Sequence, residues 1–133
     1  MDSIEGDYGV VNLLEPHIVE LIANRGVEVT PLVVEACYDA AIELCGGYCA
    51  FLINRLNDYS VTYAANQRIA DDRRLIALAY LTHSDSSARI AEYNVKLARQ
   101  ARCPIEVFRQ RESAISWLRQ HIMEYGNSQQ AAR

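Results

Sequence analysis

The chain has 133 residues, half of them apolar and 23% charged, which is the composition of one ordinary globular domain. A domain of this length buries about two thirds of its unfolded surface, so it needs no metal or disulfide to fold. The formal net charge of −4 argues against a dedicated nucleic-acid binder, because phosphate contacts call for a basic surface.

The charge is unevenly distributed along the chain. Residues 1–66 hold two basic side chains against ten acidic ones, whereas residues 67–133 hold eleven basic side chains against seven. Such an asymmetry marks either an interaction surface or the solvated faces of ordinary helices.

The cysteines and the N-terminus predict a cytoplasmic protein. Cys37, Cys45, Cys49 and Cys103 show no CxxC spacing, and no histidine is near enough in sequence to complete a zinc motif. No glycine-rich nucleotide-binding motif follows any strand, so we predict no metal site and no cofactor. The N-terminus is acidic and has no apolar signal region, and no apolar run approaches the roughly 18 residues of a transmembrane segment.

Taken in chain order, the first elements are a hairpin and a helix. Residues 8–14 and 17–23 are β-rich runs joined by a turn at Glu15-Pro16, so they should pair as an antiparallel hairpin. Thr30-Pro31 begins a helix, and Gly46-Gly47 ends it. The apolar stripe of this helix is predicted to contain Val33, Ala36, Cys37, Ala40, Ala41 and Leu44.

Further strands and helices alternate after this helix. Strands are expected at residues 48–53, 74–81 and 105–108, and helices at about 61–71, 84–102 and 111–123. From the last two helices, the residues expected to face inward are Ile90, Tyr93, Leu97, Ala101, Ala114, Ile115, Leu118 and Ile122.

This order of elements predicts an α/β fold with a single mixed, mostly parallel β-sheet, an N-terminal β-hairpin and about four helices. The domain should span residues 8–123, preceded by an N-terminal extension over residues 1–7 and followed by a disordered tail over residues 124–133. The hairpin edge and the apolar Val10-Val11 strand could pair across a two-fold axis, which makes a homodimer one open alternative.

Polar side chains concentrate at the carboxyl ends of the predicted parallel strands, where open α/β sheets bind ligands. The candidate ligand or partner loop residues are Asn54, Arg55, Asn57, Asp58, Thr82, His83, Ser84, Asp85 and Arg109. The alternative is that these residues are solvated caps and turns. A triad of Ser60, His83 and Asp58 can be drawn, but Ser60 lacks a GxSxG elbow, so a hydrolase is disfavoured and no catalytic residue is predicted.

A basic helix face is a second candidate surface. Arg89, Lys96, Arg99 and Arg102 recur at spacings that place them on neighbouring turns of one helix. This face would dock an acidic partner or phosphate head groups, or it is simply solvated.

Two segments carry a resemblance to a known family. The strand and helix RLIALAYLTHS and ARIAEYNVKLARQ, and the closing IEVFRQRESAISWLRQH, resemble the STAS/SpoIIAA-like superfamily of small bacterial α/β domains. That ending in the family is a short strand with Phe, a polar turn and a helix containing Ala-x-x-Trp-Leu. Ala114, Trp117 and Leu118 fill those places here, and the resemblance covers about residues 8–122.

The resemblance implies a non-catalytic regulatory or protein-interaction domain with a protein partner. In sporulation-type members, a partner kinase phosphorylates a serine at the start of the helix after the central strand, and the added charge switches binding. Ser60 is the hydroxyl residue at the matching position, and Thr62 is the next one. The family's phosphorylation motif is Asp-Ser-x-Gly, whereas this chain has NDYSVTY, without the glycine. The superfamily's relation to CRAL-TRIO-type domains implies the alternative, a module that binds a small apolar ligand or lipid.

Overall fold

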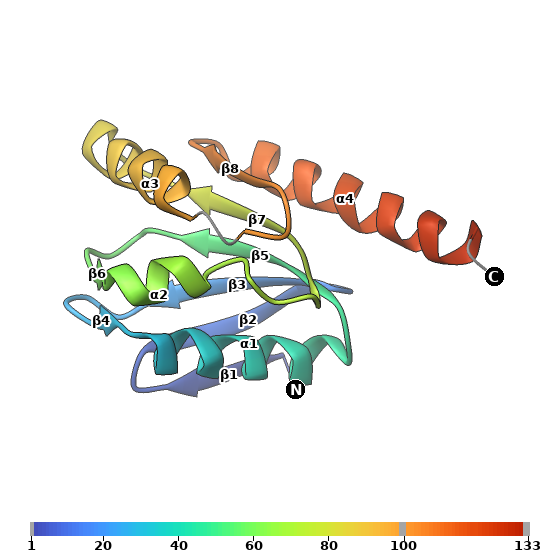
Figure 1. The fold of residues 1–133 in the computed structure, drawn as a ribbon, viewed down its shortest axis with the longest axis horizontal. Coiled ribbons are helices and arrows are strands. Elements are labelled where there is room, and N and C mark those ends of the chain that lie inside the picture. Colours follow the sequence, from blue (N-terminus) through green and yellow to red (C-terminus); the bar gives the residue numbers. More distant parts are fainter. Residues whose placement is uncertain (1, 99–100, 132–133) are drawn as a thin grey trace.

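The computed structural model describes residues 2–98 and 101–131, which fold around a mixed six-stranded sheet in the order β1-β2-β3-β5-β7-β8 (Figure 1). Strands β1 to β3 are antiparallel neighbours, and β3, β5, β7 and β8 run parallel. The α/β class and the N-terminal hairpin are therefore confirmed. The strand bounds are β1 Ser3–Gly6, β2 Gly9–Glu15, β3 Ile18–Ala23, β5 Cys49–Asn54, β7 Leu75–Leu81 and β8 Ile105–Phe108.

Helices cover both faces of this sheet (Figure 1). Helices α1 (Pro31–Cys45), α2 (Tyr63–Arg68) and α3 (Asp85–Leu97) contribute to one apolar cluster, and α4 (Arg111–Ala131) packs on the opposite face. A separate pair of two-residue parallel strands, β4 (Glu28–Val29) and β6 (Ser60–Val61), lies beside the main sheet. The parallel strands alternate with helices because each crossover must return along the face of the sheet.

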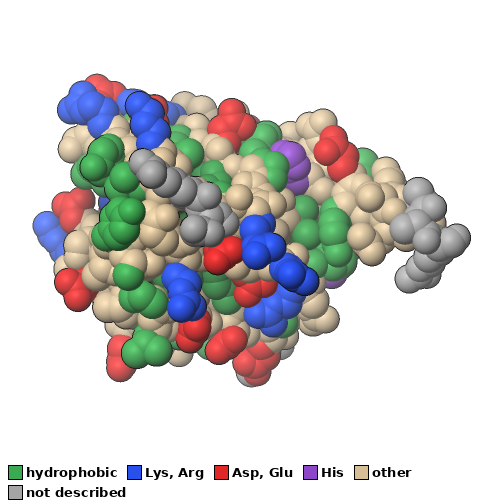
Figure 2. Space-filling model, in the orientation of Figure 1, with side chains coloured by type: hydrophobic (Ala, Val, Ile, Leu, Met, Phe, Trp, Pro, Cys, Tyr) green, Lys and Arg blue, Asp and Glu red, His purple; other side chains and the backbone are tan. Residues whose placement is uncertain are grey.

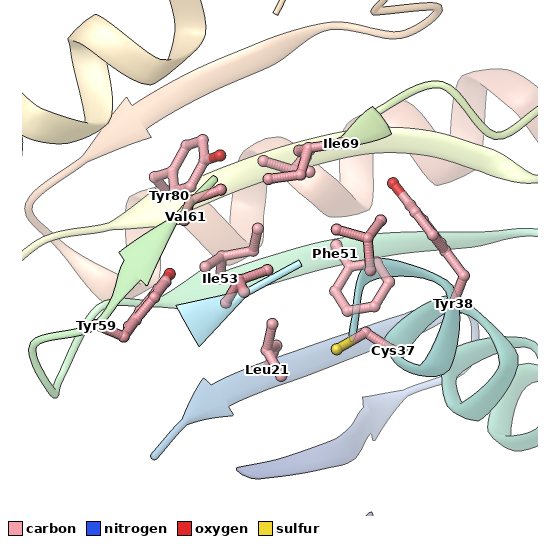
Figure 3. A pocket seen from close by; sticks show the side chains of 12 residues that line it. Leu21, Cys37, Tyr38, Phe51, Ile53, Tyr59, Val61, Ile69 and Tyr80 are labelled. Atoms are coloured by element: carbon pink, nitrogen blue, oxygen red, sulfur yellow. The ribbon is translucent and has the colours of Figure 1, made fainter. Parts of the chain in front are cut away.

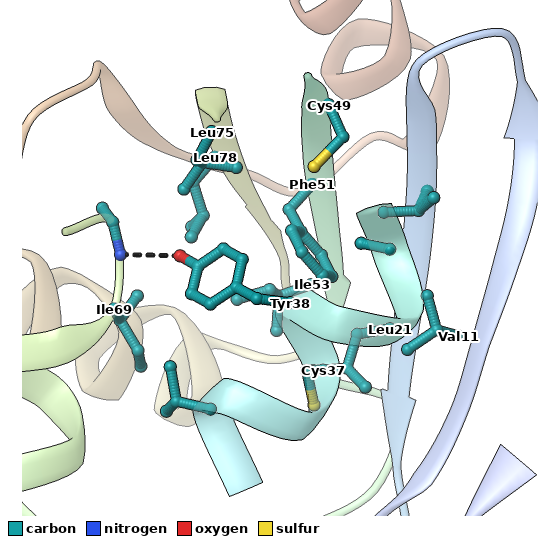
Figure 4. Packing of buried hydrophobic residues seen from close by; sticks show 14 of the residues in the cluster. Val11, Leu21, Cys37, Tyr38, Cys49, Phe51, Ile53, Ile69, Leu75 and Leu78 are labelled. Atoms are coloured by element: carbon teal, nitrogen blue, oxygen red, sulfur yellow. Dashed lines mark hydrogen bonds between the residues drawn. The ribbon is translucent and has the colours of Figure 1, made fainter. Parts of the chain in front are cut away.

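The ends of α1 follow from its capping residues. The Thr30 hydroxyl accepts a hydrogen bond from the Val33 amide, and Gly46 ends the helix in the left-handed conformation with φ of 76°. The buried stripe differs from the predicted one, because Ala36 is exposed and Tyr38 is buried. The Tyr38 hydroxyl accepts the amide hydrogen of Ala70 at 2.9 Å, which joins α1 to the segment after α2 (Figure 4). This hydrogen bond requires Tyr38 to face the core, so the buried face of α1 is rotated relative to the predicted apolar stripe.

Both predicted termini of the domain are corrected. The expected N-terminal extension contains β1, which pairs with β2, so the Val10-Val11 strand is not the edge of the sheet. The expected tail from residue 124 continues α4 to Ala131. Its Tyr125 ring packs at 4.6 Å on Tyr48, which stacks on His17, and this aromatic contact holds the last turns against the body of the domain.

The middle helices also differ from their predictions. Helix α2 is shorter than expected, and Thr62 caps it, whereas Ser60 lies in β6 and caps nothing. Helix α3 begins after Ser84, as predicted, but it ends at Leu97. The side chains that α3 buries are Ala88 and Ala91.

The predicted inner face of α3 is the outer one. Ile90 and Tyr93 are 48% and 62% exposed, Leu97 is half-buried, and Ala101 is exposed beyond the helix end. Alanines let α3 lie close to its neighbours, which larger side chains would prevent. In α4 the prediction is confirmed: Ala114 and Leu118 are fully buried on the alanine-rich faces of β5 and β7, and Ile115 and Ile122 are half-buried beside them.

Candidate functional site

The parallel strands bring most of the predicted loop residues to one edge of the sheet. Strands β5 and β7 are neighbours in register, with Asn54 opposite Leu81, and β8 follows on the far side of β7. The residues after these strands, among them Arg55, His83 and Arg109, therefore share the carboxyl edge where α/β proteins place their sites.

On the α4 side of this edge, four polar residues form a hydrogen-bonded cluster, which we call the edge cluster: Glu20, Asn54, His83 and Arg111. The Glu20 carboxylate is only 4% exposed. It accepts from Asn54 Nδ2 at 3.0 Å and from both terminal nitrogens of Arg111 at 2.6 and 3.1 Å. These bonds and the charge of Glu20 raise the pKa of Arg111. The buried carboxylate is thus paired and satisfied.

The edge cluster also fixes the orientation of His83. Because Asn54 Nδ2 donates to Glu20, the Asn54 amide oxygen faces His83 Nε2 at 2.7 Å, and that ring nitrogen must be the donor. Both oxygens of Glu20 already accept hydrogen bonds from the Arg111 guanidinium, so this carboxylate is fully engaged. The hydrogen bonds of the edge cluster connect β3, β5, the β7–α3 loop and α4.

The drawn triad does not assemble. The Nε2 of His83 is engaged by Asn54, while Ser60 donates its amide to the Val27 carbonyl within the small sheet. Asp58 is exposed, and its backbone carbonyl accepts from Gly26. The recorded hydrogen bonds therefore do not join these three residues as a catalytic triad would require.

Most of the other loop residues have structural partners. Asn57 donates to the Ala23 carbonyl, Thr82 is buried and donates to the Phe108 carbonyl, and Ser84 caps α3. Asp85 and Arg109 form an exposed ion pair at 2.6 Å. Ser84 therefore acts as a helix cap, and the Asn57 and Thr82 side chains fix the backbone of neighbouring segments.

Arg55 is the exception among them. Its side chain is 7% exposed, and its guanidinium carbon lies 4.5 Å above the Tyr59 ring. Within the described residues, its Nε and Nη1 atoms are inaccessible to solvent and have no hydrogen-bond partner. A buried arginine with two unsatisfied donors is an uncommon and costly arrangement.

Tyr59 also lines an apolar cavity of about 40 Å³ between α1, the segments on either side of α2 and the sheet (Figure 3). Figure 3 shows side chains from the sheet, α1 and the loops around α2 directed into it. The lining residues are Leu21, Val29, Val34, Cys37, Tyr38, Phe51, Ile53, Tyr59, Val61, Ile69, Leu78 and Tyr80. Burial raises the pKa of the Cys37 thiol to about 12, so this cysteine behaves as a small apolar residue.

Large apolar side chains are exposed on the neighbouring α2 and α3. We define the α2–α3 face by Leu56, Tyr63, Ile90 and Tyr93, which are between 48% and 66% exposed. Figure 2 shows hydrophobic side chains gathered down the side of the molecule where α3 and α2 lie. The hydroxyl-bearing residue Ser60 is exposed in the short strand before α2, whereas the Thr62 hydroxyl is engaged in capping that helix.

The predicted basic helix face is only partly present. Arg89 and Lys96 are exposed on α3, but Arg102 lies beyond the helix and pairs with Asp71 at 2.7 Å. Arg99 lies outside the described residues. The exposed positive charge on α3 itself therefore comes from Arg89 and Lys96, and the same helix also exposes the acidic residues Asp85 and Glu92.

Sequence reasoning missed Glu20 and Arg111, the two charged members of the edge cluster. One signal was present for Glu20, a lone acidic residue in the apolar run IVELIA that forms β3. A carboxylate buried in a strand needs a cationic partner, but the sequence did not say which of the arginines supplies it.

Across residues 2–98 and 101–131, no group of three or more histidine, cysteine or acidic side chains is placed to hold a metal ion. Within the same ranges, the helices are too short or too polar to cross a membrane. Comparison with family models, curated proteins and solved structures finds no significant match to this chain. A functional assignment therefore rests on the geometry described above and on the resemblance noted in the sequence.

Proposed function

We propose that this chain is a regulatory protein-interaction domain of the STAS/SpoIIAA-like type and that a partner protein docks on its α2–α3 face. The observation that carries the proposal is the orientation of α3. Its large apolar side chains Ile90 and Tyr93 face solvent, while its alanines serve the domain's own core. An apolar stripe that the domain does not bury itself is a typical binding surface.

The α2–α3 face is held rigid before any partner arrives. The Asn66 side chain of α2 donates to the Asn94 carbonyl of α3 at 3.0 Å, and the Gln67 side chain donates to the Leu97 carbonyl. A preformed surface loses little conformational entropy on binding. Its aromatic residues Tyr63 and Tyr93 belong to the residue types that supply most of the free energy of binding at protein interfaces.

The charges beside the apolar residues indicate the chemistry of the partner. Besides Ile90 and Tyr93, α3 exposes the basic residues Arg89 and Lys96 and the acidic residue Glu92, while Asp85 at its start pairs with Arg109. The basic residues therefore outnumber the acidic one beside the face. A complementary surface would present apolar side chains at its centre and acidic ones at its rim. The partner is thus proposed to be a protein with an acidic, apolar patch.

Phosphorylation of Ser60 is proposed as the switch. Ser60 is exposed, and its sequence neighbours at the face, Leu56 and Tyr63, are exposed apolar residues. A phosphate would add about −1.5 to −2 charges at the margin of the docking surface. The added charge would oppose an acidic partner, so phosphorylation is proposed to release it.

The lipid-binding alternative receives no support from the size of the cavity. A cavity of about 150 Å³ is what holds a benzene molecule, whereas this one measures about 40 Å³.

The docking proposal is tested by changing the face and measuring capture of partners from the native cells. The double variant Ile90→Asp/Tyr93→Asp should reduce recovery of a specific partner at least about tenfold, because two interface residues are lost and two charges must be desolvated. The matched control is Met123→Asp, since Met123 is an equally exposed apolar residue on α4 at 65%. The control variant should bind the purified partner as well as the unchanged protein does. Equal binding by the unchanged protein, the double variant and the control would contradict the proposal.

The switch is tested on the same purified partner. Ser60→Asp is expected to weaken its binding by about tenfold, and Ser60→Ala should leave it unchanged. Ser116→Asp on α4 introduces the same charge at an exposed serine remote in sequence from the face and serves as the control. Intact-mass analysis of the protein from its native cells should show a phosphate gain that maps to Ser60. Undiminished binding by Ser60→Asp would remove the switch and leave the docking proposal standing.

A further inference from the structure

We propose that Arg55 binds the carboxylate of a short aliphatic acid whose hydrocarbon end occupies the apolar cavity between α1 and the sheet. This site is distinct from the α2–α3 face, and the inference does not depend on protein docking. It rests on the unsatisfied guanidinium, on its contact with Tyr59, which lines the cavity, and on the cavity's size.

The guanidinium of Arg55 lacks an anionic partner. Each of the ion pairs found between described residues uses another arginine, and Arg55 takes part in none of them. The ring of Tyr59 covers one face of the guanidinium, and this cation–π contact stabilises part of the charge. It leaves Nε and Nη1 without acceptors in a buried position. Nε and Nη1 are buried and bond to no protein acceptor, so an oxygen supplied by a ligand would satisfy them.

Strand alternation places Arg55 on the cavity side of the sheet. The Arg55 amide donates to the Leu81 carbonyl, so the β5–β7 ladder continues one residue past the end of β5. Side chains two residues apart on a strand face the same way, and Phe51 and Ile53 both line the cavity. Arg55 therefore follows them on that face, at its carboxyl-edge end.

Tyr59 and Tyr80 line the cavity beside this end (Figure 3). Burial raises the pKa of both phenols, so each keeps its proton near neutral pH. A neutral tyrosine hydroxyl can donate to an anion, and the arginine supplies the charge. The polar end of the site is thus rich in donors, while the rest of the lining is hydrocarbon, aromatic carbon and one thiol.

The lining and the volume together select the ligand class. A multiply charged anion such as phosphate would have to lose its hydration next to apolar walls, with one arginine as its only counter-charge among the described residues near it. A carboxylate carries a single charge, and its hydrocarbon end matches the lining. The cavity of about 40 Å³ corresponds to roughly three water-sized positions. An acid with a chain of about three or four carbons fits that space, and an aromatic or long-chain acid does not.

Thermal unfolding of the full chain tests the site with sodium butyrate as the probe. At about ten times the dissociation constant, butyrate should raise the unfolding temperature by about 5 °C over an equal concentration of sodium chloride. Neutral butyramide should give no such shift, because it lacks the charge that Arg55 recognises. Arg55→Met should abolish the butyrate shift, and Arg89→Met, which removes an exposed arginine of α3, should retain it.

A second measurement on the unchanged protein covers the case in which Arg55→Met fails to fold. The buried Nε–H of Arg55 should exchange with water more slowly than the corresponding groups of the exposed arginines, which identifies its NMR signal. That signal should move saturably with butyrate and stay in place with butyramide. Equal unfolding temperatures in butyrate and chloride, a butyrate shift that survives in Arg55→Met, or an Nε–H signal indifferent to butyrate would each overturn the proposal.

Discussion

Replacing Arg111 by methionine is expected to lower the free energy of unfolding by about 3 kcal/mol, as measured by urea denaturation. The change leaves the Glu20 carboxylate buried at 4% exposure with Asn54 as its remaining donor. Removing one partner of a buried ion pair costs about 3–5 kcal/mol, and the lower end applies here because the Arg111 side chain is 44% exposed. Methionine keeps most of the arginine's apolar stem, so the loss reports the charge and its hydrogen bonds.

The chain contains a matched control on the same helix. Arg119 also forms an ion pair with two hydrogen bonds to a glutamate, Glu15, at 2.7 and 2.8 Å. In this pair, however, the side chains of both Arg119 and Glu15 reach solvent. Arg119→Met should therefore leave the urea midpoint almost unchanged, since exposed ion pairs contribute little. Equal losses from the two variants would show that burial of Glu20 is not what makes the edge cluster important.

Where a local signal decides an element, the sequence was sufficient. The N-cap threonine, first-turn proline and terminal glycine define α1 at both ends, because each satisfies or removes a specific backbone group of that helix. The hairpin of β2 and β3 follows in the same way from two β-rich runs and the turn at Glu15-Pro16. The mixed sheet then follows from the alternation of the later elements.

Where two faces of a helix compete, the sequence was not sufficient. Periodicity in α3 offers one stripe with Ile90 and Tyr93 and another with Ala88 and Ala91, and hydrophobicity alone favours the larger side chains. The alanine face is the one that is buried, because α3 lies too close to its neighbours for larger side chains. That distance is a property of the tertiary structure and cannot be read from the helix sequence. The length of α4 also depends on tertiary structure, because its last turns pack against the domain through the contact of Tyr125 with the Tyr48 ring.

The candidate site shows both situations. Asn54 and His83 could be placed at one edge because they follow strands that the alternation makes parallel neighbours. Arg111 could not be joined to Glu20, since 91 residues separate them and several other arginines were equally eligible. Arg55 was identified as a loop residue, yet an arginine after a strand is ordinarily solvated. Its burial, with Tyr59 packed over the guanidinium, depends on tertiary packing that the sequence does not reveal.

Replacing Gly9 by alanine is the second change expected to have a large effect, with a loss of about 3 kcal/mol in the free energy of unfolding. Gly9 has φ of 142°, which residues with a Cβ rarely adopt, and the added Cβ would lie 2.2 Å from the Ile22 carbonyl oxygen and 2.9 Å from the Ala23 Cα. Both obstacles are backbone atoms of β3, so no side-chain rotation relieves them.

The strand that would have to move also carries Glu20, so this variant connects the start of β2 to the edge cluster. Gly9→Ala should shift the His83 and Asn54 side-chain NMR signals as well as the urea midpoint, because β3 holds the carboxylate that orients both groups. Gly47→Ala is the control, since its Cβ would meet nothing within 4 Å and its backbone is not left-handed. That variant should be as stable as the parent or slightly more so, by less than about 1 kcal/mol. If Gly9→Ala proved equally stable, β2 and β3 would not pair as closely at this end as the register of Gly9 with Ala23 requires.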